Sequence, residues 1–75
     1  GFKMELDKKM ELLAELFELE IDEFGPETVL EDLEEWDSLA AISYVVMMDE
    51  EFNKVANPAD IQGFKTVNDI LNSMK

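Results

Sequence analysis

The chain contains no cysteine, no histidine and no arginine, and only two prolines and three glycines among its 75 residues. Without cysteine it cannot form a disulfide or offer a thiolate as a nucleophile or metal ligand. Without histidine it lacks the imidazole that serves in many catalytic and metal sites. Triads of the Ser-His-Asp or Cys-His kind are therefore excluded, and we expect no resident metal.

Basic residues are scarce as well. Six lysines stand against 19 acids, which gives a net charge of −13. Nucleic-acid binding needs lysine and arginine against the phosphates, so we expect no nucleic-acid partner. Between Lys9 and Lys54 every ionisable side chain except Tyr44 is acidic. Such a surface steers basic partner surfaces towards it.

A long hydrophobic run is also absent. The longest apolar stretch, Leu39 to Met48, contains Ser43 and Tyr44 and is too short to cross a bilayer, so it is interpreted as a core helix. No secretion signal is recognisable, and we expect a cytoplasmic monomer. The length predicts one domain over residues 1–75, with residues 1–3 as a flexible tail or an expression remnant.

The periodicity of apolar residues predicts an amphipathic helix from about Met4, with Leu6, Met10, Leu13 and Phe17 on one side. Acids cluster after it and Gly25-Pro26 follows, so we expect this helix to end near residues 20–22. Its connection to the next helix is long and predicts a short helical turn, begun by a capping box of Thr28 and Glu31.

Asp37 is a good N-cap for a second helix that runs to about Phe52. Its expected buried side consists of apolar residues: Leu39, Ile42, Val45, Val46 and Met48.

Two further helices are indicated after it. Asn57-Pro58 predicts a short helix ending near Gly63, and Thr66 with Asp69 predicts a capping box for the last helix. The expected inner face of the last helix is Val67, Ile70, Leu71 and Met74. The predicted fold class is all-α, a small four-helix bundle with three longer helices and one short helix.

Ser38 is the residue most suited to carry a modification, because it follows the N-cap at the end of the long loop. A phosphate ester there would face free backbone N–H groups and the positive end of the helix dipole. The residues alone favour a structural interpretation, in which the serine merely begins a helix beside an aspartate cap.

The string Asp37-Ser38-Leu39, followed by an apolar helix that ends Asp49-Glu50-Glu51-Phe52, resembles an acyl carrier protein. The resemblance covers nearly the whole chain, including the closing helix introduced by residues 64–67. It implies that Ser38 receives 4′-phosphopantetheine from coenzyme A through a separate, magnesium-dependent phosphopantetheinyl transferase. The terminal thiol of that arm would carry an acyl group as a thioester, and the protein itself would be no enzyme.

The resemblance also implies partner and cargo residues. Partner enzymes would contact Asp37, Leu39, Asp49, Glu50 and Glu51, and they would be an acyl-loading ligase and an acyltransferase or synthase with basic patches. Candidates for contact with the acyl chain are Ile42, Val46, Met47, Ile61 and Ile70. Each of these apolar residues can equally be ordinary core.

Four positions depart from the pattern of fatty-acid-synthesis carriers. Ala40 and Ser43 stand where that group commonly has acids, Glu35 where it often has glycine, and Trp36 where it has a small or aliphatic residue. These departures favour a specialised carrier that serves a dedicated ligase or acyltransferase, as in cell-surface or secondary-metabolite assembly. We expect the Trp36 ring to cover the start of the second helix with its indole N–H at the surface.

Parts of the sequence are also compatible with other functions. Aminoacyl and peptidyl carriers are usually less acidic around the second helix, so the charge favours acyl cargo, with D-alanyl and aryl carriers left open. From a different class, the chain is also interpretable as an unmodified acidic adaptor that binds a basic partner surface. An enzyme would have to rely on carboxylates, lysines and Tyr44 for all acid-base chemistry.

Overall fold

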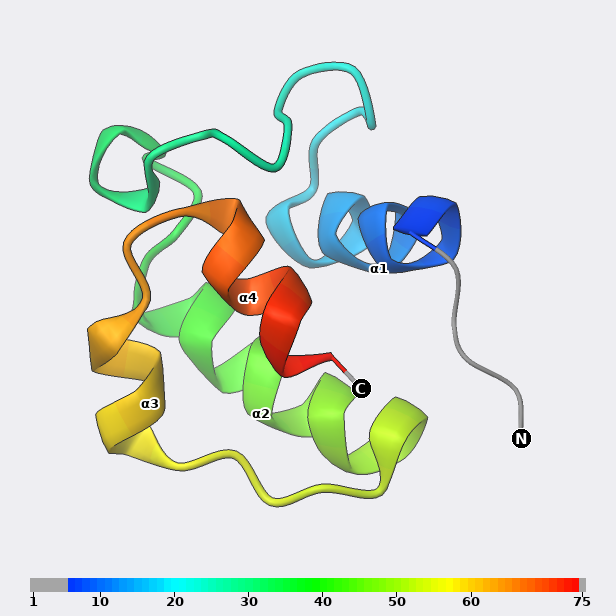
Figure 1. The fold of residues 1–75 in the computed structure, drawn as a ribbon, viewed down its shortest axis with the longest axis vertical. Coiled ribbons are helices and arrows are strands. Elements are labelled where there is room, and N and C mark those ends of the chain that lie inside the picture. The colour runs from blue at the N-terminus through cyan, green and yellow to red at the C-terminus, as the bar shows by residue number, and fades with distance from the viewer. Residues whose placement is uncertain (1–5, 75) are drawn as a thin grey trace.

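The computed structural model describes residues 6–74. Along the chain the elements are α1 (Leu6–Phe17), the 3-10 helix η1 (Leu30–Asp32), α2 (Ser38–Phe52), α3 (Pro58–Gly63) and α4 (Val67–Ser73) (Figure 1). Within these residues the only β-type pairing is a single antiparallel bridge between Val29 and Thr66. The predicted all-α fold with three longer helices and one short helix is confirmed.

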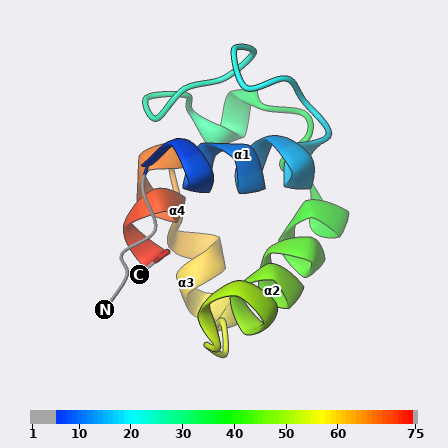
Figure 2. The ribbon, with the colours of Figure 1, turned by 90° about the vertical axis from the view of Figure 1, so that its right-hand side faces the viewer.

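The helix α1 lies across the other helices, with α2 beneath one of its ends and α4 beneath the other (Figure 2). Its buried residues follow the helical period: Met10, Leu13, Ala14 and Phe17. The predicted start near Met4 lies outside the described residues. The predicted end near residues 20–22 is wrong, because the helix ends at Phe17.

The early end of α1 has a local cause. Glu18 adopts the left-handed conformation with φ 58°, and the Leu19 amide donates to the Ala14 carbonyl at 2.9 Å. This is the Schellman arrangement, in which the chain reverses and an apolar residue returns to the core. Leu19 packs against the core. The helix therefore ends at Phe17, well before Gly25-Pro26, because this turn lets Leu19 pack against the core.

The long loop after α1 is held to the start of α4 by backbone hydrogen bonds. The Leu30 amide donates to the Lys65 carbonyl at 2.9 Å, the Val67 amide to Thr28 at 3.0 Å, and the Asn68 amide to Pro26 at 2.8 Å. The predicted helical turn is present as η1, but the predicted capping box is wrong. The hydroxyl of Thr28 instead accepts from the Gly25 amide at 2.9 Å and closes a turn.

The helix α2 has the predicted bounds, but its predicted buried side is largely wrong. Of the expected residues only Met48 is buried, and Leu39 is 69% and Ile42 62% exposed. The buried residues are instead Ala40, Tyr44, Met47 and Met48. Because α2 is apolar nearly all round, sequence periodicity cannot select the side that faces the core.

The two last helices follow the prediction. Asn57 caps α3 by accepting from the Ala59 amide at 2.9 Å, and Pro58 occupies the first turn. At the start of α4, the Asp69 side chain reaches back towards the residues before the helix. Its Oδ2 accepts hydrogen bonds from the amides of Thr66 at 3.1 Å and Lys65 at 2.8 Å. The predicted inner face of α4 is buried throughout.

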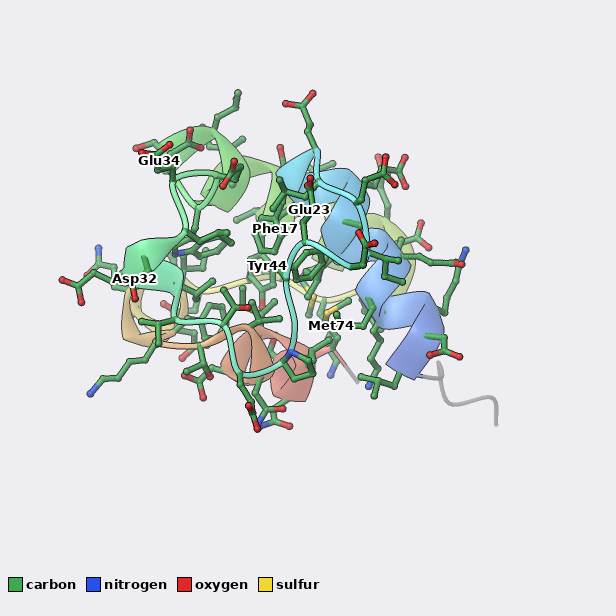
Figure 3. The ribbon with its side chains drawn as sticks, turned by 90° about the horizontal axis from the view of Figure 1, so that it is seen from above. Phe17, Glu23, Asp32, Glu34, Tyr44 and Met74 are labelled. Atoms are coloured by element: carbon green, nitrogen blue, oxygen red, sulfur yellow. The ribbon has the colours of Figure 1, made fainter. Side chains whose placement is uncertain are left out.

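Aromatic side chains connect the loop to the core. Trp36 lies between three rings, with centroid distances of 6.1 Å to Phe17, 6.5 Å to Tyr44 and 6.4 Å to Phe64. Seen from the side of the loop, Phe17 and Tyr44 lie inside the molecule, whereas Asp32 and Glu34 point outwards (Figure 3). The rings thus fix residue 36, and with it the entry of the chain into α2.

Candidate functional site

Ser38 is the first residue of α2, and the residue before it fixes this position. Asp37 has an extended backbone, and its Oδ1 accepts a hydrogen bond from the Ala40 amide at 2.9 Å. Its carbonyl accepts from the Ala41 amide at 3.0 Å. The cap therefore starts the helix at Ser38, as the sequence predicts.

The surroundings of Ser38 leave its hydroxyl accessible. Its side chain is exposed and makes no hydrogen bond within residues 6–74. The first amides of a helix have no carbonyl partner in the helix, and those of Ser38 and Leu39 have none among the described backbone hydrogen bonds. An ester oxygen on this hydroxyl would meet free N–H donors and the positive end of the α2 dipole.

The other two serines of the chain have different surroundings. Ser43 is half-buried on the side of α2 that faces α1. Ser73 donates to the Ile70 carbonyl at 2.6 Å, and its Oγ is 2.7 Å from the Tyr44 hydroxyl. Ser38 is therefore the most accessible of the three hydroxyls.

Two hollows flank α2 beside Ser38. One, of about 620 Å³, lies between α2 and α3; its lining includes Ser38, Ile42, Ile61 and Phe64. The other, of about 530 Å³, is a groove between α1 and α2. Asp37 lines both of them, so the N-terminus of α2 forms the ridge that separates the two hollows.

The five predicted cargo residues do not lie in one cavity. Ile42 and Ile61 share the hollow next to Ser38, whereas Val46 and Met47 line the groove on the other side of α2. Ile70 is fully buried in the core. Helical spacing alone does not distinguish these three surroundings.

The five predicted partner residues are all exposed: Asp37, Leu39, Asp49, Glu50 and Glu51. Ser38 and Asp49 are eleven positions apart on one helix, which is about 16 Å along its axis. Among residues 6–74 the one ion pair is Lys8 with Glu11 at 4.0 Å, so none of these carboxylates is neutralised by a lysine in the described part of the chain.

A partly buried polar pair connects α2 to α4, and no motif or spacing in the sequence indicates it. Tyr44 is only 2% exposed, and its hydroxyl bonds to the Ser73 side chain of α4. Burial raises the pKa of the Tyr44 phenol, the hydrogen bond with Ser73 opposes this rise, and the charge of Asp60 adds to it. Nothing in the spacing of residues 44 and 73 indicates that they meet.

Comparison with known families supplies the deciding observation. The family model described as phosphopantetheine attachment site matches residues 10–73. The chain belongs to the phosphopantetheine-attachment family. No curated protein and no solved structure matches it. The predicted resemblance to carrier proteins is thereby confirmed at the level of the acyl or peptidyl carrier family.

Membership of the phosphopantetheine-attachment family establishes the cofactor, which is covalently attached 4′-phosphopantetheine. Carriers of this family generally catalyse no reaction themselves and work with a transferase and with biosynthetic enzymes. The start of α2 fits the group, because it combines an exposed hydroxyl with unbonded amides and an adjacent open hollow. None of the helices within residues 6–74 has the length and apolarity that a membrane span requires.

Proposed function

We propose that this chain is an acyl carrier whose 4′-phosphopantetheine arm is attached to Ser38. The observation that carries the proposal is the exposed, unbonded Ser38 hydroxyl at the capped start of α2, within a chain that matches the attachment family. The arm supplies a terminal thiol, which replaces the cysteine that the chain lacks and holds the cargo as a thioester.

The residues around Ser38 have distinct roles in this proposal. Asp37 holds the helix start in place, so that the Ser38 Oγ projects towards a transferase. The free amides of Ser38 and Leu39 stabilise the negative charge of the phosphodiester, a contribution of about 0.3 to 1 kcal/mol at an exposed helix end. The hollow with Ile42 and Ile61 is the nearest apolar surface on which cargo could lie. Val46 and Met47 line the groove on the other side of α2, and Ile70 is buried in the core.

Partner enzymes are proposed to dock on α2 through Asp37, Leu39, Asp49, Glu50 and Glu51. Unpaired carboxylates accelerate encounter with basic surfaces and disfavour acidic ones. The proposed partners are a phosphopantetheinyl transferase, a loading ligase, and an acyltransferase or synthase, all in the cytoplasm. The carrier is proposed to act as a monomer and a single domain.

The proposed pathway is specialised and lies outside primary fatty-acid synthesis. Ala40 and Ser43 occupy positions where carriers of that pathway commonly have acids. Here Ala40 is buried and Ser43 half-buried, and both line the groove between α1 and α2. A partner that depends on acids at these two positions would lose its contacts. A dedicated partner would contact a different surface of the carrier.

Intact mass tests the attachment. The protein is incubated with a promiscuous phosphopantetheinyl transferase, coenzyme A and magnesium, alongside the variants Ser38→Ala and Ser43→Ala. We expect one phosphopantetheine addition on the parent chain and on Ser43→Ala, and none on Ser38→Ala. Full addition to a folded Ser38→Ala protein would overturn the site assignment.

The second candidate is an unmodified acidic adaptor, favoured by the same unpaired carboxylates on α2. It predicts that Ser38→Ala binds a partner as well as the parent chain does. It also predicts that Glu50→Lys slows association and weakens its salt dependence. If the folded parent chain acquires no phosphopantetheine, this adaptor becomes the leading function.

A further inference from the structure

The groove between α1 and α2 combines an apolar floor with an acidic rim. Its floor includes Leu12 and Leu16 from α1 and Leu39, Val46 and Met47 from α2. Leu39 is 69% and Val46 49% exposed, although both are large apolar residues on an ordered helix. Exposed apolar surface of this kind, when rimmed by polar residues, marks an interaction site.

The rim carries charge of one sign only. Six carboxylates line the groove, and no lysine does: Glu15, Glu18, Glu35, Asp37, Glu50 and Glu51. The only ion pair within residues 6–74 lies outside the groove, on Lys8 and Glu11. The rim acids therefore have no counter-charge within the described part of the chain, and we expect an occupant of the groove to bring positive charge to both edges.

These two features select the occupant. A second copy of this chain is repelled, because each copy has a net charge of −13, and nucleic acid or an anionic membrane is repelled for the same reason. A trough between two helices accepts a third helix, whose apolar row packs into the floor while flanking residues meet the rim. The α2 side of the groove from Leu39 to Glu50 spans eleven positions, about three helical turns.

We propose that the α1–α2 groove docks a basic amphipathic helix of a partner enzyme. This deepens the proposed function, because it adds α1, through Glu15 and Glu18, to the surface that partners read. Asp37 and Leu39 line the groove next to Ser38. A helix docked here therefore lies against the base of the arm and leaves the hollow between α2 and α3 open.

The test uses the full-length Ser38→Ala protein, so that docking is measured independently of phosphopantetheine attachment. The probe is a synthetic amphipathic peptide of leucine and lysine, and its control is a peptide of the same composition without the amphipathic pattern. The groove variant is Glu15→Gln with Glu18→Gln. Its charge-matched control is Glu27→Gln with Glu31→Gln, two exposed acids that do not line the groove.

We expect the groove variant to weaken binding of the amphipathic peptide by about five-fold, and the control variant by less than about two-fold. Leu39→Ala should also weaken binding, whereas Val55→Ala, at a 95% exposed residue outside the groove, should not. Amide chemical-shift changes should concentrate on the groove residues. Equal effects of the two double variants, or equal binding of both peptides, would overturn the proposal while leaving the Ser38 mass test unaffected.

Discussion

Asp37 and Ala40 are joined by a hydrogen bond of 2.9 Å from the Ala40 amide to the Asp37 carboxylate, and this bond determines where α2 begins. Ser38 is consequently the first helical residue and projects from the corner between the loop and α2. Asp37 thus positions the proposed attachment site, because it caps the helix and also lines the two hollows beside Ser38.

Replacing Asp37 tests this relationship. Asp37→Ala removes the cap and should lower the free energy of unfolding by about 1 kcal/mol, and Asp37→Asn, which keeps an accepting oxygen, by only a few tenths. For a chain of this size the alanine variant should melt about 4–8 °C lower. Urea and thermal unfolding measure both. Equal destabilisation by the two variants would contradict a capping role.

The hydrogen bond between the buried Tyr44 and the half-buried Ser73 predicts different costs for removing either hydroxyl. Tyr44→Phe leaves the Ser73 hydroxyl bonded to the Ile70 carbonyl and should cost about 1 kcal/mol. Ser73→Ala leaves the Tyr44 hydroxyl without its hydrogen-bond partner. It should therefore lower the free energy of unfolding by more, about 1–3 kcal/mol. Urea unfolding of both variants compares the costs. A larger loss in Tyr44→Phe would argue against a buried, partner-dependent phenol.

Tyr44 also predicts the behaviour of the protein in alkali. It is the only tyrosine, so ultraviolet absorbance reports its ionisation directly. Burial raises its pKa above the usual 10.0, so the folded state holds the proton more tightly than the unfolded state does. This contribution to stability is complete below pH 10 and is lost as the pH rises through the folded-state pKa. An ionisation midpoint at or below pH 10 in the folded protein would contradict it.

Features of the fold and of the site could be predicted from the sequence where the interacting residues lie close together along the chain. The caps of α2 and α4 involve residues three or four positions apart, and both were predicted, as was the start of α3 at Pro58. The place of Ser38 as the first residue of α2 was predicted for the same reason, because the cap is made by the adjacent Asp37. The capping box at Thr28 was wrong, because the loop uses that hydroxyl to close a turn with Gly25.

Long-range features were not predictable. The end of α1 depends on Leu19 returning to the core, and the course of the loop depends on the backbone bond from Leu30 to Lys65. The orientation of α2 depends on the side that carries Tyr44, whose ring packs against Trp36 and Phe64. Its β-branched residues were predicted to be core, but Ile42 and Val46 face the two hollows. The sequence therefore indicated that α2 begins at Ser38, but it did not indicate the groove between α1 and α2.

Asp69 predicts a second pH effect, in acid. Hydrogen bonds from the Lys65 amide, and next from the Thr66 amide, lower the pKa of its carboxyl below 3.8. Its contribution to stability is therefore present above the unfolded-state pKa and is lost as the pH falls through the folded-state pKa. At pH 7 the melting temperature of Asp69→Ala should be lower than that of the parent chain. This difference in melting temperature should become smaller in strong acid.

The matched control for Asp69 is Asp32→Ala, which removes an exposed acid that makes no side-chain hydrogen bond within residues 6–74. It lowers the negative charge equally but removes no cap. Two results would contradict the capping role of the Asp69 carboxylate. One is a melting-temperature difference between Asp69→Ala and the parent chain that does not change with pH. The other is a difference equal to that of Asp32→Ala at every pH.

The measurement that tests the central claim most directly is localisation of the arm by tandem mass spectrometry. After incubation with transferase, coenzyme A and magnesium, trypsin releases residues 10–54, a peptide that contains Ser38 and Ser43 but not Ser73. Fragment ions between the two serines show which of them is modified. The account predicts phosphopantetheine on Ser38 alone. An arm on Ser43, or an unmodified peptide from folded protein, would contradict it.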